Sequence, residues 1–244
     1  MGVSALQLLE RRIAEDGVVL PGGILKVDGF LNHLMDPVLF TEMARELYRL
    51  YEGEGVNKIL TIEASGIGLA CITGQVFGCP VLFAKKNRTR NLFGDFWTAT
   101  VHSFTHGNTN TILVSKDYIG PGDRVLIVDD FLANGAALHG LISLGRQAGA
   151  AVVGAGIAIE KAFQPGGELI RSEGVRVESL ARIKSMTDDG QIEFCCGRAE
   201  KLHTATRYNL DDMVPRSLPG RRKWPDYRQG GGAARLLPPR PVAA

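Results

Sequence analysis

The stretch from residue 125 to residue 137 limits the possible folds of this chain more than any other. Residues 125–128 are four aliphatic residues in a row, three of them β-branched, which predicts a strand buried on both faces. Asp129 and Asp130 follow, where we expect this strand to leave its sheet. Two adjacent carboxylates repel each other and are costly to desolvate without a partner. The pair therefore indicates a ligand site, unless Asp130 only caps a helix.

A phosphate site is predicted directly after this pair. A short turn with Asn134 and Gly135 leads into residues 136–147, whose apolar spacing predicts a helix. The N–H groups of such a turn and of a helix N-terminus bind phosphate readily. Carboxylates beside a phosphate site suit a ligand that carries both hydroxyl and phosphate groups, which indicates a ribose phosphate.

Composition is consistent with a protein that folds in the cytoplasm. The chain has 244 residues, 45% of them hydrophobic, enough for one full core or two small ones. No apolar run approaches the length of a membrane span, and residues 6–15 read as an amphipathic helix rather than a signal peptide. The four cysteines have no metal-site spacing, so we expect reduced thiols.

Charge and composition separate the C-terminal segment from the rest. Residues 199–244 carry nine basic and four acidic side chains, a net +5, which leaves −3 for the remainder. A mildly acidic core gives no reason to propose nucleic-acid binding. The scattered Pro, Gly and Arg residues of the segment predict a poorly ordered tail.

Other strands and helices are expected on both sides of the central motif. Residues 58–63, 67–77 and 81–84 read as strand, helix and strand, a unit that predicts a parallel sheet. Asp36 and Pro37 are typical of a helix start, and this helix should run to about Tyr51. The remaining expectations are a helix at 4–14 capped by Ser4, strands at 24–28, 112–114, 152–160, 175–183 and 191–195, and a short helix at 166–172.

Two lysines are candidates to bind the same ligand. Lys85 and Lys86 come directly after the strand at 81–84, so they should leave the sheet at the same edge as Asp129. Ligands of open α/β sheets bind at this edge, outside the carboxyl ends of the strands. We therefore expect the two ammonium groups to meet phosphate oxygens, although a charge run alone is usually a solvated face.

The run at 125–137 resembles the 5-phosphoribosyl 1-pyrophosphate (PRPP) motif of type I phosphoribosyltransferases. The form Asp-Asp-Phe-Leu-Ala-Asn-Gly is similar to one branch, the bacterial xanthine phosphoribosyltransferases. Many members of the superfamily have threonines in this loop, where the present chain has Asn134 and Ala137. The resemblance extends over roughly residues 5–196, with further matches at 17–20, 25–33, 62–68, 159–166 and 177–183.

This resemblance implies an α/β fold with a parallel twisted sheet flanked by helices, a small hood and a flexible flap. Residues 1–197 would form the domain, with the flap near residues 87–110, and residues 198–244 would be the tail. The implied reaction converts xanthine and PRPP to XMP and pyrophosphate, with Mg²⁺ carried by PRPP, near Asp129, and no direct metal ligand. The family is dimeric, and the apolar residues Phe30, Leu31 and Leu34 would suit a partner surface.

The resemblance also assigns roles to particular residues. Asp129 and Asp130 would be catalytic, holding the ribose hydroxyls. The PRPP-binding residues would be Ala133, Asn134, Gly135, Ala136 and Ala137 for the 5′-phosphate, and Ser65, Gly66, Lys85 and Lys86 for the pyrophosphate. Leu25, Asn32 and Lys161 would contact xanthine.

Two alternatives remain open from the sequence. The same reaction could use guanine or hypoxanthine instead of xanthine. The chain could also be a purine-responsive regulator that senses PRPP without catalysis. Known regulators of that kind carry a DNA-binding domain ahead of this fold, which the residues before Leu25 are too few to form.

Overall fold

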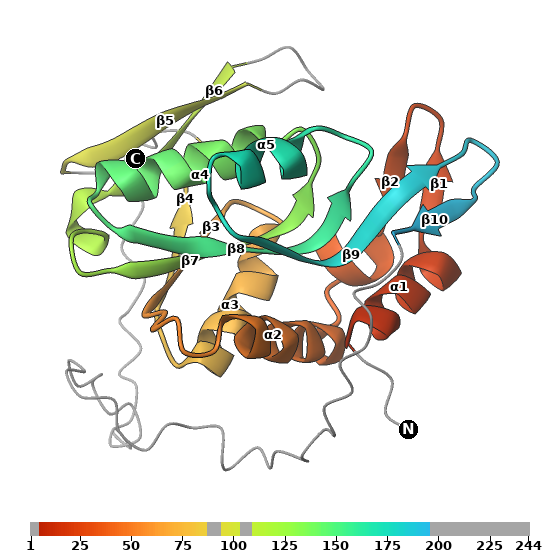
Figure 1. The fold of residues 1–244 in the computed structure, drawn as a ribbon, viewed down its shortest axis with the longest axis horizontal. Coiled ribbons are helices and arrows are strands. Elements are labelled where there is room, and N and C mark those ends of the chain that lie inside the picture. Colours follow the sequence, from red (N-terminus) through yellow and green to blue (C-terminus); the bar gives the residue numbers. More distant parts are fainter. Residues whose placement is uncertain (1–4, 87–93, 103–108, 196–244) are drawn as a thin grey trace, which may run out of the picture. The chain divides into compact units, whose positions relative to one another are not determined.

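The fold is built on one central sheet (Figure 1). The structure is a computed structural model that describes residues 5–86, 94–102 and 109–195. Six strands lie in the order β10-β9-β8-β7-β3-β4, and only the pair β9 and β10 is antiparallel. Their bounds are Lys58–Ile62 (β3), Val81–Ala84 (β4), Arg124–Leu132 (β7), Ala151–Lys161 (β8), Val177–Met186 (β9) and Ile192–Phe194 (β10). The sheet is therefore parallel, as predicted, except at one edge.

Helices cover both faces of this sheet (Figure 1). Helices α2 (Pro37–Tyr51) and α3 (Gly66–Phe77) lie on one face, and α4 (Ala136–Gln147) and α5 (Gly166–Ser172) lie on the other. Residues 125–128 are fully buried and alternate between the two faces, so that Leu126 and Val128 enter one core and Val125 and Ile127 the other. The predicted buried strand and the predicted helices at 136–147 and 166–172 are thus confirmed.

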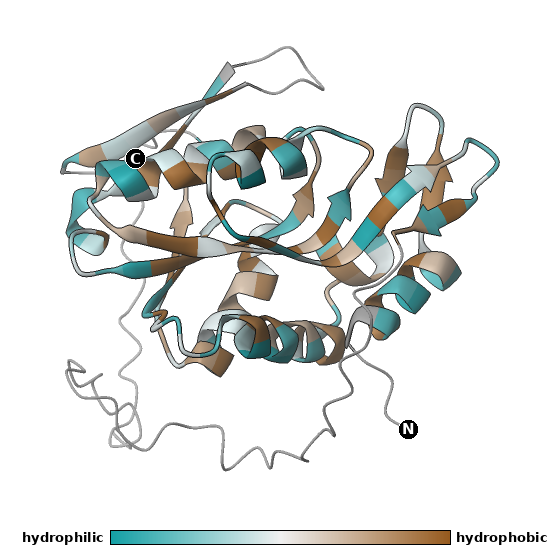
Figure 2. Ribbon diagram, in the orientation of Figure 1, coloured by the Kyte–Doolittle hydropathy of each residue, from teal (hydrophilic) through white to brown (hydrophobic). Residues whose placement is uncertain are grey.

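Helix α2 begins as the sequence predicts. The Asp36 carboxylate accepts hydrogen bonds from the N–H groups of Val38 and Leu39, at 3.0 and 3.1 Å, and Pro37 occupies the first helical position. Polar and apolar positions are both visible on α1 and α2 in Figure 2, as expected for helices that bury one face. Helix α1 spans Ala5–Asp16, and its predicted cap Ser4 lies outside the described residues.

The N-terminal hood consists of a hairpin and a helical turn. Strands β1 (Val18–Leu20) and β2 (Ile24–Lys26) pair antiparallel, and Asp28–Asn32 form a π-helical turn. Phe30 and Leu31 are fully buried in the core shared with α1 and α2, so they cannot form the partner surface that the sequence suggested. Of the three apolar residues proposed for that surface, Leu34 alone is exposed, at 66%.

The base of the expected flap is an antiparallel ribbon outside the main sheet. Strands β5 (Phe96–His102) and β6 (Thr109–Ser115) pair with each other and pack beside α4, and a 3₁₀ turn, Lys116–Tyr118, follows. Two backbone hydrogen bonds of 2.9 Å between Lys85 and Leu113 join this ribbon to the end of β4. The other flap residues, 87–93 and 103–108, lie outside the described residues, as does the predicted tail at 198–244.

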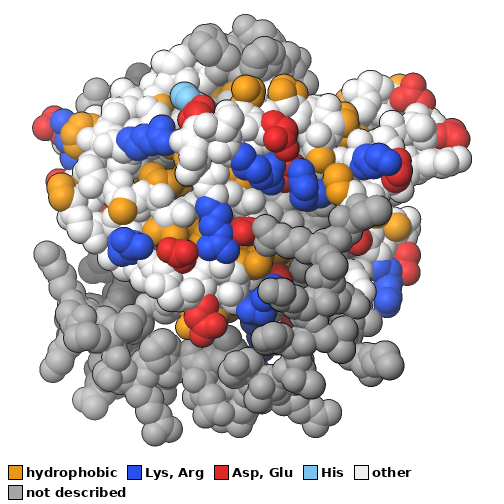
Figure 3. Space-filling view, viewed as in Figure 1, with side chains coloured by type: hydrophobic (Ala, Val, Ile, Leu, Met, Phe, Trp, Pro, Cys, Tyr) orange, Lys and Arg blue, Asp and Glu red, His pale blue; other side chains and the backbone are white. Residues whose placement is uncertain are grey.

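Charges of both signs lie side by side on the face that carries α4, α5 and β9 (Figure 3). Among the ion pairs of these elements, Arg171 of α5 and Arg182 of β9 bind the buried Glu160 of β8, and Lys184 of β9 binds Glu193 of β10. Among the described residues, no helix is both long and apolar enough to cross a membrane.

Candidate active site

The two aspartates lie on a part of β7 that pairs on one side only. Toward β8, the pairing of β7 continues through Leu132, because β8 is eleven residues long. Toward β3, the pairing covers only Val125–Ile127. Asp129 and Asp130 are therefore still part of the strand, whereas the sequence placed them at its end. A cavity of about 310 Å³ opens where β3 and β7 part.

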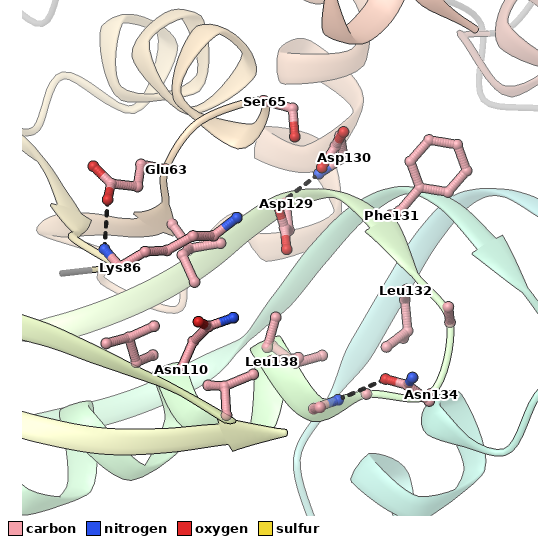
Figure 4. Close-up of a pocket in the computed structure, with 17 residues that line it drawn as sticks. Glu63, Ser65, Lys86, Asn110, Asp129, Asp130, Phe131, Leu132, Asn134 and Leu138 are labelled. Carbon is pink, nitrogen blue, oxygen red and sulfur yellow. Dashed lines mark hydrogen bonds between the residues drawn. The ribbon is translucent and has the colours of Figure 1, made fainter. Parts of the chain in front are cut away.

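This cavity brings together most of the residues predicted to bind PRPP (Figure 4). Asp129, Asp130, Ser65 and Lys86 line it, together with the whole loop 133–137. The other lining residues are Ile62, Glu63, Val101, Asn110, Ile112, Phe131, Leu132 and Leu138. Four stretches that are far apart in the sequence thus line one space: residues 62–65, Lys86, the ribbon residues Val101, Asn110 and Ile112, and residues 129–138. They combine carboxylates, an ammonium group and backbone amides.

The aspartate pair is almost completely buried, with 5% of Asp129 and 7% of Asp130 exposed. Burial raises the pKa of Asp129 well above its ordinary value, the charge of Asp130 raises it further, and the Lys86 ammonium opposes both effects. The Asp129 Oδ1 atom accepts a hydrogen bond of 3.0 Å from the Asp130 N–H. A positive charge that enters the cavity would stabilise the ionised pair. Such strongly perturbed carboxylates are typical of functional sites.

The loop after β7 is held by backbone contacts with the start of α5. Gly135 has a φ of +86°, which favours glycine, and a Cβ on Gly166 would lie only 2.4 Å from the Gly135 nitrogen. The Gly166 N–H donates to the Ala133 carbonyl at 3.1 Å. The first N–H groups of α4 have no partner within the helix, although the Ala136 N–H donates to Asn134 Oδ1 at 3.2 Å, and Ala136 and Ala137 line the cavity. This arrangement suits a phosphate group.

Gly66 allows α3 to begin directly against the aspartates. A Cβ at this position would lie 2.4 Å from Thr61 Oγ1 and 2.7 Å from Asp129 Oδ1. The φ of Gly66 is not positive, so the close approach, not the backbone conformation, requires glycine here. The Glu63–Ala64 peptide bond just before it is cis. Ser65 lines the cavity, whereas Gly66 packs behind it.

The two lysines predicted to meet phosphates differ in position. Lys86 lines the cavity, and its charge acts on Asp129. Lys85 does not line it, because its backbone pairs with Leu113 and its ammonium lies 5.9 Å from the centre of the Phe83 ring. Their neighbours Arg88 and Arg90 lie outside the described residues.

The three residues predicted to contact the base lie outside this cavity. Leu25 is buried in the hairpin, and Asn32 is the half-buried last residue of the π-helical turn. Lys161 reaches the same hairpin, because its Nζ donates to the Gly23 carbonyl at 2.8 Å. Burial lowers the pKa of Lys161. The ring of Phe131, which lines the cavity, lies 5.9 Å from this Nζ and connects the two groups of residues.

Sequence reasoning missed two polar residues of the cavity wall, Glu63 and Asn110. Glu63 is next to the predicted loop 64–66, so its position in the chain was a usable signal. Asn110 enters the cavity from β6, where it pairs with Val101 of β5. Its place depends on how the ribbon packs against α4, and no local pattern could have indicated it.

A comparison with protein-family models matches residues 38–169 to the phosphoribosyl transferase domain. The match covers more than half of the chain and includes Asp129, Asp130 and the loop 133–137. The chain belongs to the phosphoribosyltransferase family. This membership confirms the family and the fold that the resemblance implied.

Named relatives of this phosphoribosyltransferase are similar over nearly their whole length. A protein of Lachnoclostridium phytofermentans named xanthine phosphoribosyltransferase is 54% identical over 190 residues, which cover 78% of this chain and 98% of that protein. A protein of the same name from Pediococcus pentosaceus is 50% identical over 189 residues, covering 78% and 100%.

Solved structures with a similar fold include adenine phosphoribosyltransferases. The one from Rhodothermus marinus has a TM-score of 0.61 at 24% identity and covers 73% of this chain and 98% of that one. The one from Giardia lamblia, solved with 9-deazaadenine, has a TM-score of 0.62 at 22% identity, covering 74% and 98%. At this identity the similarity shows the fold alone.

Phosphoribosyltransferases generally use Mg²⁺ together with PRPP. In the described part of the chain, no three His, Cys, Asp or Glu side chains lie close enough together to hold a metal ion by themselves. Mg²⁺ usually keeps several waters and binds one or two carboxylates plus substrate phosphates. The aspartate pair in the cavity fits that requirement.

Proposed function

We propose that this phosphoribosyltransferase makes XMP and pyrophosphate from xanthine and PRPP, a reaction of purine salvage. The observation that carries the proposal is the cavity that combines the aspartate pair with the loop 133–137. Sequence identity of 50–54% to proteins named xanthine phosphoribosyltransferase supports it. The C1–pyrophosphate bond of PRPP breaks while N9 of xanthine attacks C1. This chemistry requires positioning and charge stabilisation rather than a protein nucleophile.

Each part of the cavity then has a distinct role. Asp129 and Asp130 hold the ribose hydroxyls and complement the positive charge that develops on the ribose ring. The amides of residues 133–137 bind the 5′-phosphate. Lys86 and the loop around Ser65 and Gly66 neutralise the departing pyrophosphate. Lys85 contributes chiefly through its backbone, which fixes the base of the ribbon to the sheet.

Mg²⁺ would be carried by the phosphate oxygens of PRPP, and Asp129 and Asp130 are the carboxylates of the cavity that would hold it. When bound, it neutralises the pyrophosphate charge.

We also propose that the enzyme is a cytoplasmic homodimer. Leu34 and Met35, just before α2, and Val38, in its first turn, are exposed apolar side chains available to such an interface.

Base specificity is proposed to reside in Leu25, Asn32 and Lys161. Lys161 donates to the 6-oxo group of the purine. Adenine is rejected because it has a 6-amino group there, which is also a donor. The Asn32 amide donates to the 2-oxo group of xanthine or, when rotated, accepts from the 2-amino group of guanine. Hypoxanthine offers neither group at position 2.

The first test is to incubate the purified protein with PRPP, Mg²⁺ and each base in turn. The expected order of kcat/KM is xanthine, then guanine, then hypoxanthine, with adenine essentially unused. Chromatography of the nucleotide products measures it. PRPP binding in calorimetry, without nucleotide formation from any base, would instead support a PRPP-sensing regulator.

An Asn32→Ala variant should have a smaller difference in kcat/KM between xanthine and hypoxanthine than the wild type. The Asn32 amide is half-buried, and a bound base would cover it. Hypoxanthine would then leave it unpaired at a cost of about 1–3 kcal/mol, which is roughly 5- to 150-fold in kcat/KM, and the variant removes that difference. The measurement is kcat/KM for both bases, with Gln191→Ala, an exposed amide on the β9–β10 turn, as control. An equal loss with both bases would mean that Asn32 shapes the hood without reading the base.

A further inference from the structure

Glu63 places a third carboxylate on the wall of a cavity that should receive two phosphate groups. It lines the same space as Asp129, Asp130 and Lys86. A negative charge at this position repels pyrophosphate, so the electrostatics of binding do not explain it. The carboxylate therefore requires another role.

The contacts of Glu63 indicate that role. Its Oε1 accepts a hydrogen bond of 2.5 Å from the backbone N–H of Lys86, which Figure 4 shows as a dashed line. Its own N–H donates to the Ala84 carbonyl at 3.1 Å, at the end of β4. Glu63 thus binds both the last residue of β4 and the second residue after it.

Among the described residues, no strand of the sheet pairs with the backbone of Lys86, so the hydrogen bond from Glu63 acts where strand pairing has ended. Strand β4 ends at Ala84, and the pairing of the ribbon with this segment stops at Lys85. Lys86 is exposed, and its long side chain has several rotatable bonds. Where the ammonium lies therefore depends strongly on where its backbone is held. Glu63 holds that backbone from the loop that also carries Ser65.

We propose that Glu63 is a positioning residue, which holds Lys86 at the pyrophosphate end of the cavity through the backbone N–H of Lys86. The inference rests on the proposed function, because it takes Lys86 as the cation that meets pyrophosphate. Glu63 contributes through its hydrogen bond to the Lys86 N–H and not through its negative charge. Glutamine can supply that hydrogen bond, because its side-chain carbonyl is also an acceptor.

The test compares Glu63→Ala with Glu63→Gln. Glu63→Ala should raise the KM for PRPP roughly tenfold, equivalent to about 1.4 kcal/mol, while the KM for xanthine stays within about twofold. Glu63→Gln should restore most of the lost PRPP affinity. Glu168→Ala, which removes an exposed carboxylate on α5, is the control. Calorimetry with PRPP and Mg²⁺, without a base, gives the same comparison independently of turnover.

A double-mutant cycle with Lys86→Ala completes the experiment. Adding Glu63→Ala to Lys86→Ala should change the KM for PRPP little, because the side chain that Glu63 positions is already gone. Equal losses in Glu63→Ala and Glu63→Gln, no loss in either, or fully additive losses with Lys86→Ala would each overturn the inference. If the wild-type protein binds PRPP but forms no nucleotide from any base, the proposed function is wrong. The inference about Glu63 can still be tested in that case, because calorimetry compares PRPP binding by the Glu63 variants without turnover.

Discussion

Changing Asp129 to Asn should lower the turnover number by roughly 10²-fold or more, the scale of losing one preorganised electrostatic group. Asparagine keeps the size of the side chain and an oxygen that can accept from the Asp130 N–H, so the variant mainly removes charge. The loss should appear in kcat at saturating PRPP, Mg²⁺ and xanthine. Folding should be unaffected or improved, because a buried charge next to Asp130 is costly.

The matched control for this variant is Asp188→Asn, which makes the same chemical change at an exposed position in the β9–β10 turn. Its kcat should equal that of the wild type. If Asp129→Asn also keeps nearly full activity, Asp129 does not stabilise the transition state and the assignment is wrong. A loss of folded protein in circular dichroism would instead give the carboxylate a structural role.

Changing Arg171 to Ala should lower the free energy of unfolding by about 3 kcal/mol, the lower end of the range for breaking a buried ion pair from one side. Glu160 is only 1% exposed, and Arg171 binds both of its carboxylate oxygens, at 2.8 and 2.7 Å. Without Arg171 the buried charge keeps Ser179 and, at 3.3 Å, Arg182 as partners. These two remaining partners are why the loss should lie at the lower end. Chemical denaturation measures it.

The pH dependence of this loss provides a second check. Burial alone would raise the pKa of Glu160, but hydrogen bonds from Arg171 and Ser179 and the nearby positive charges outweigh it, so the pKa lies below its ordinary value. In the wild type this stabilisation is present above the unfolded-state pKa of about 4.3 and is lost as the pH falls through the lower folded-state pKa. Without Arg171 the folded-state pKa should rise, and protonation should then relieve the buried charge. The difference between variant and wild type should therefore be largest near neutral pH and shrink in acid.

The control is Lys184→Ala, which breaks an ion pair with Glu193 on the surface. Exposed pairs contribute little to stability, so its unfolding curve should nearly coincide with that of the wild type. A deficit in Arg171→Ala that stays constant as the pH falls would show that lost packing, not the buried charge of Glu160, accounts for the change.

The sequence predicted those parts of the site that one continuous stretch determines. The aliphatic run before Asp129, the turn at Gly135 and the helix spacing from Ala136 each have a local cause. The loop and the helix lie where expected, and the strand differs only in continuing through the two aspartates to Leu132. Asp36 and Pro37 likewise carry the signal for α2 within two residues. Such features depend on backbone preferences and on burial of one short segment.

Features that depend on contacts between distant segments were predicted less well. Lys85 and Lys86 look equivalent in the sequence, but only Lys85 pairs with Leu113, so the two residues have different surroundings. The burial of Phe30 arises from packing against α1, where the Arg12 guanidinium lies 5.4 Å from its ring centre. The antiparallel β10 also differs from the expected parallel sheet, because it returns directly after β9.

The contact between Gly135 and Gly166 has a consequence for redesigning base preference. Lys161 ends β8, and only residues 162–165 separate it from Gly166, whose backbone lies against the phosphate loop. The contact is between backbone atoms, so no change of side-chain rotamer can relieve a clash there. Inserting or deleting a residue in 162–165, in order to move Lys161 relative to the base, would therefore displace the loop 133–137 as well. Laboratory evolution toward a new base should accept point substitutions in residues 162–165 and reject changes in their length.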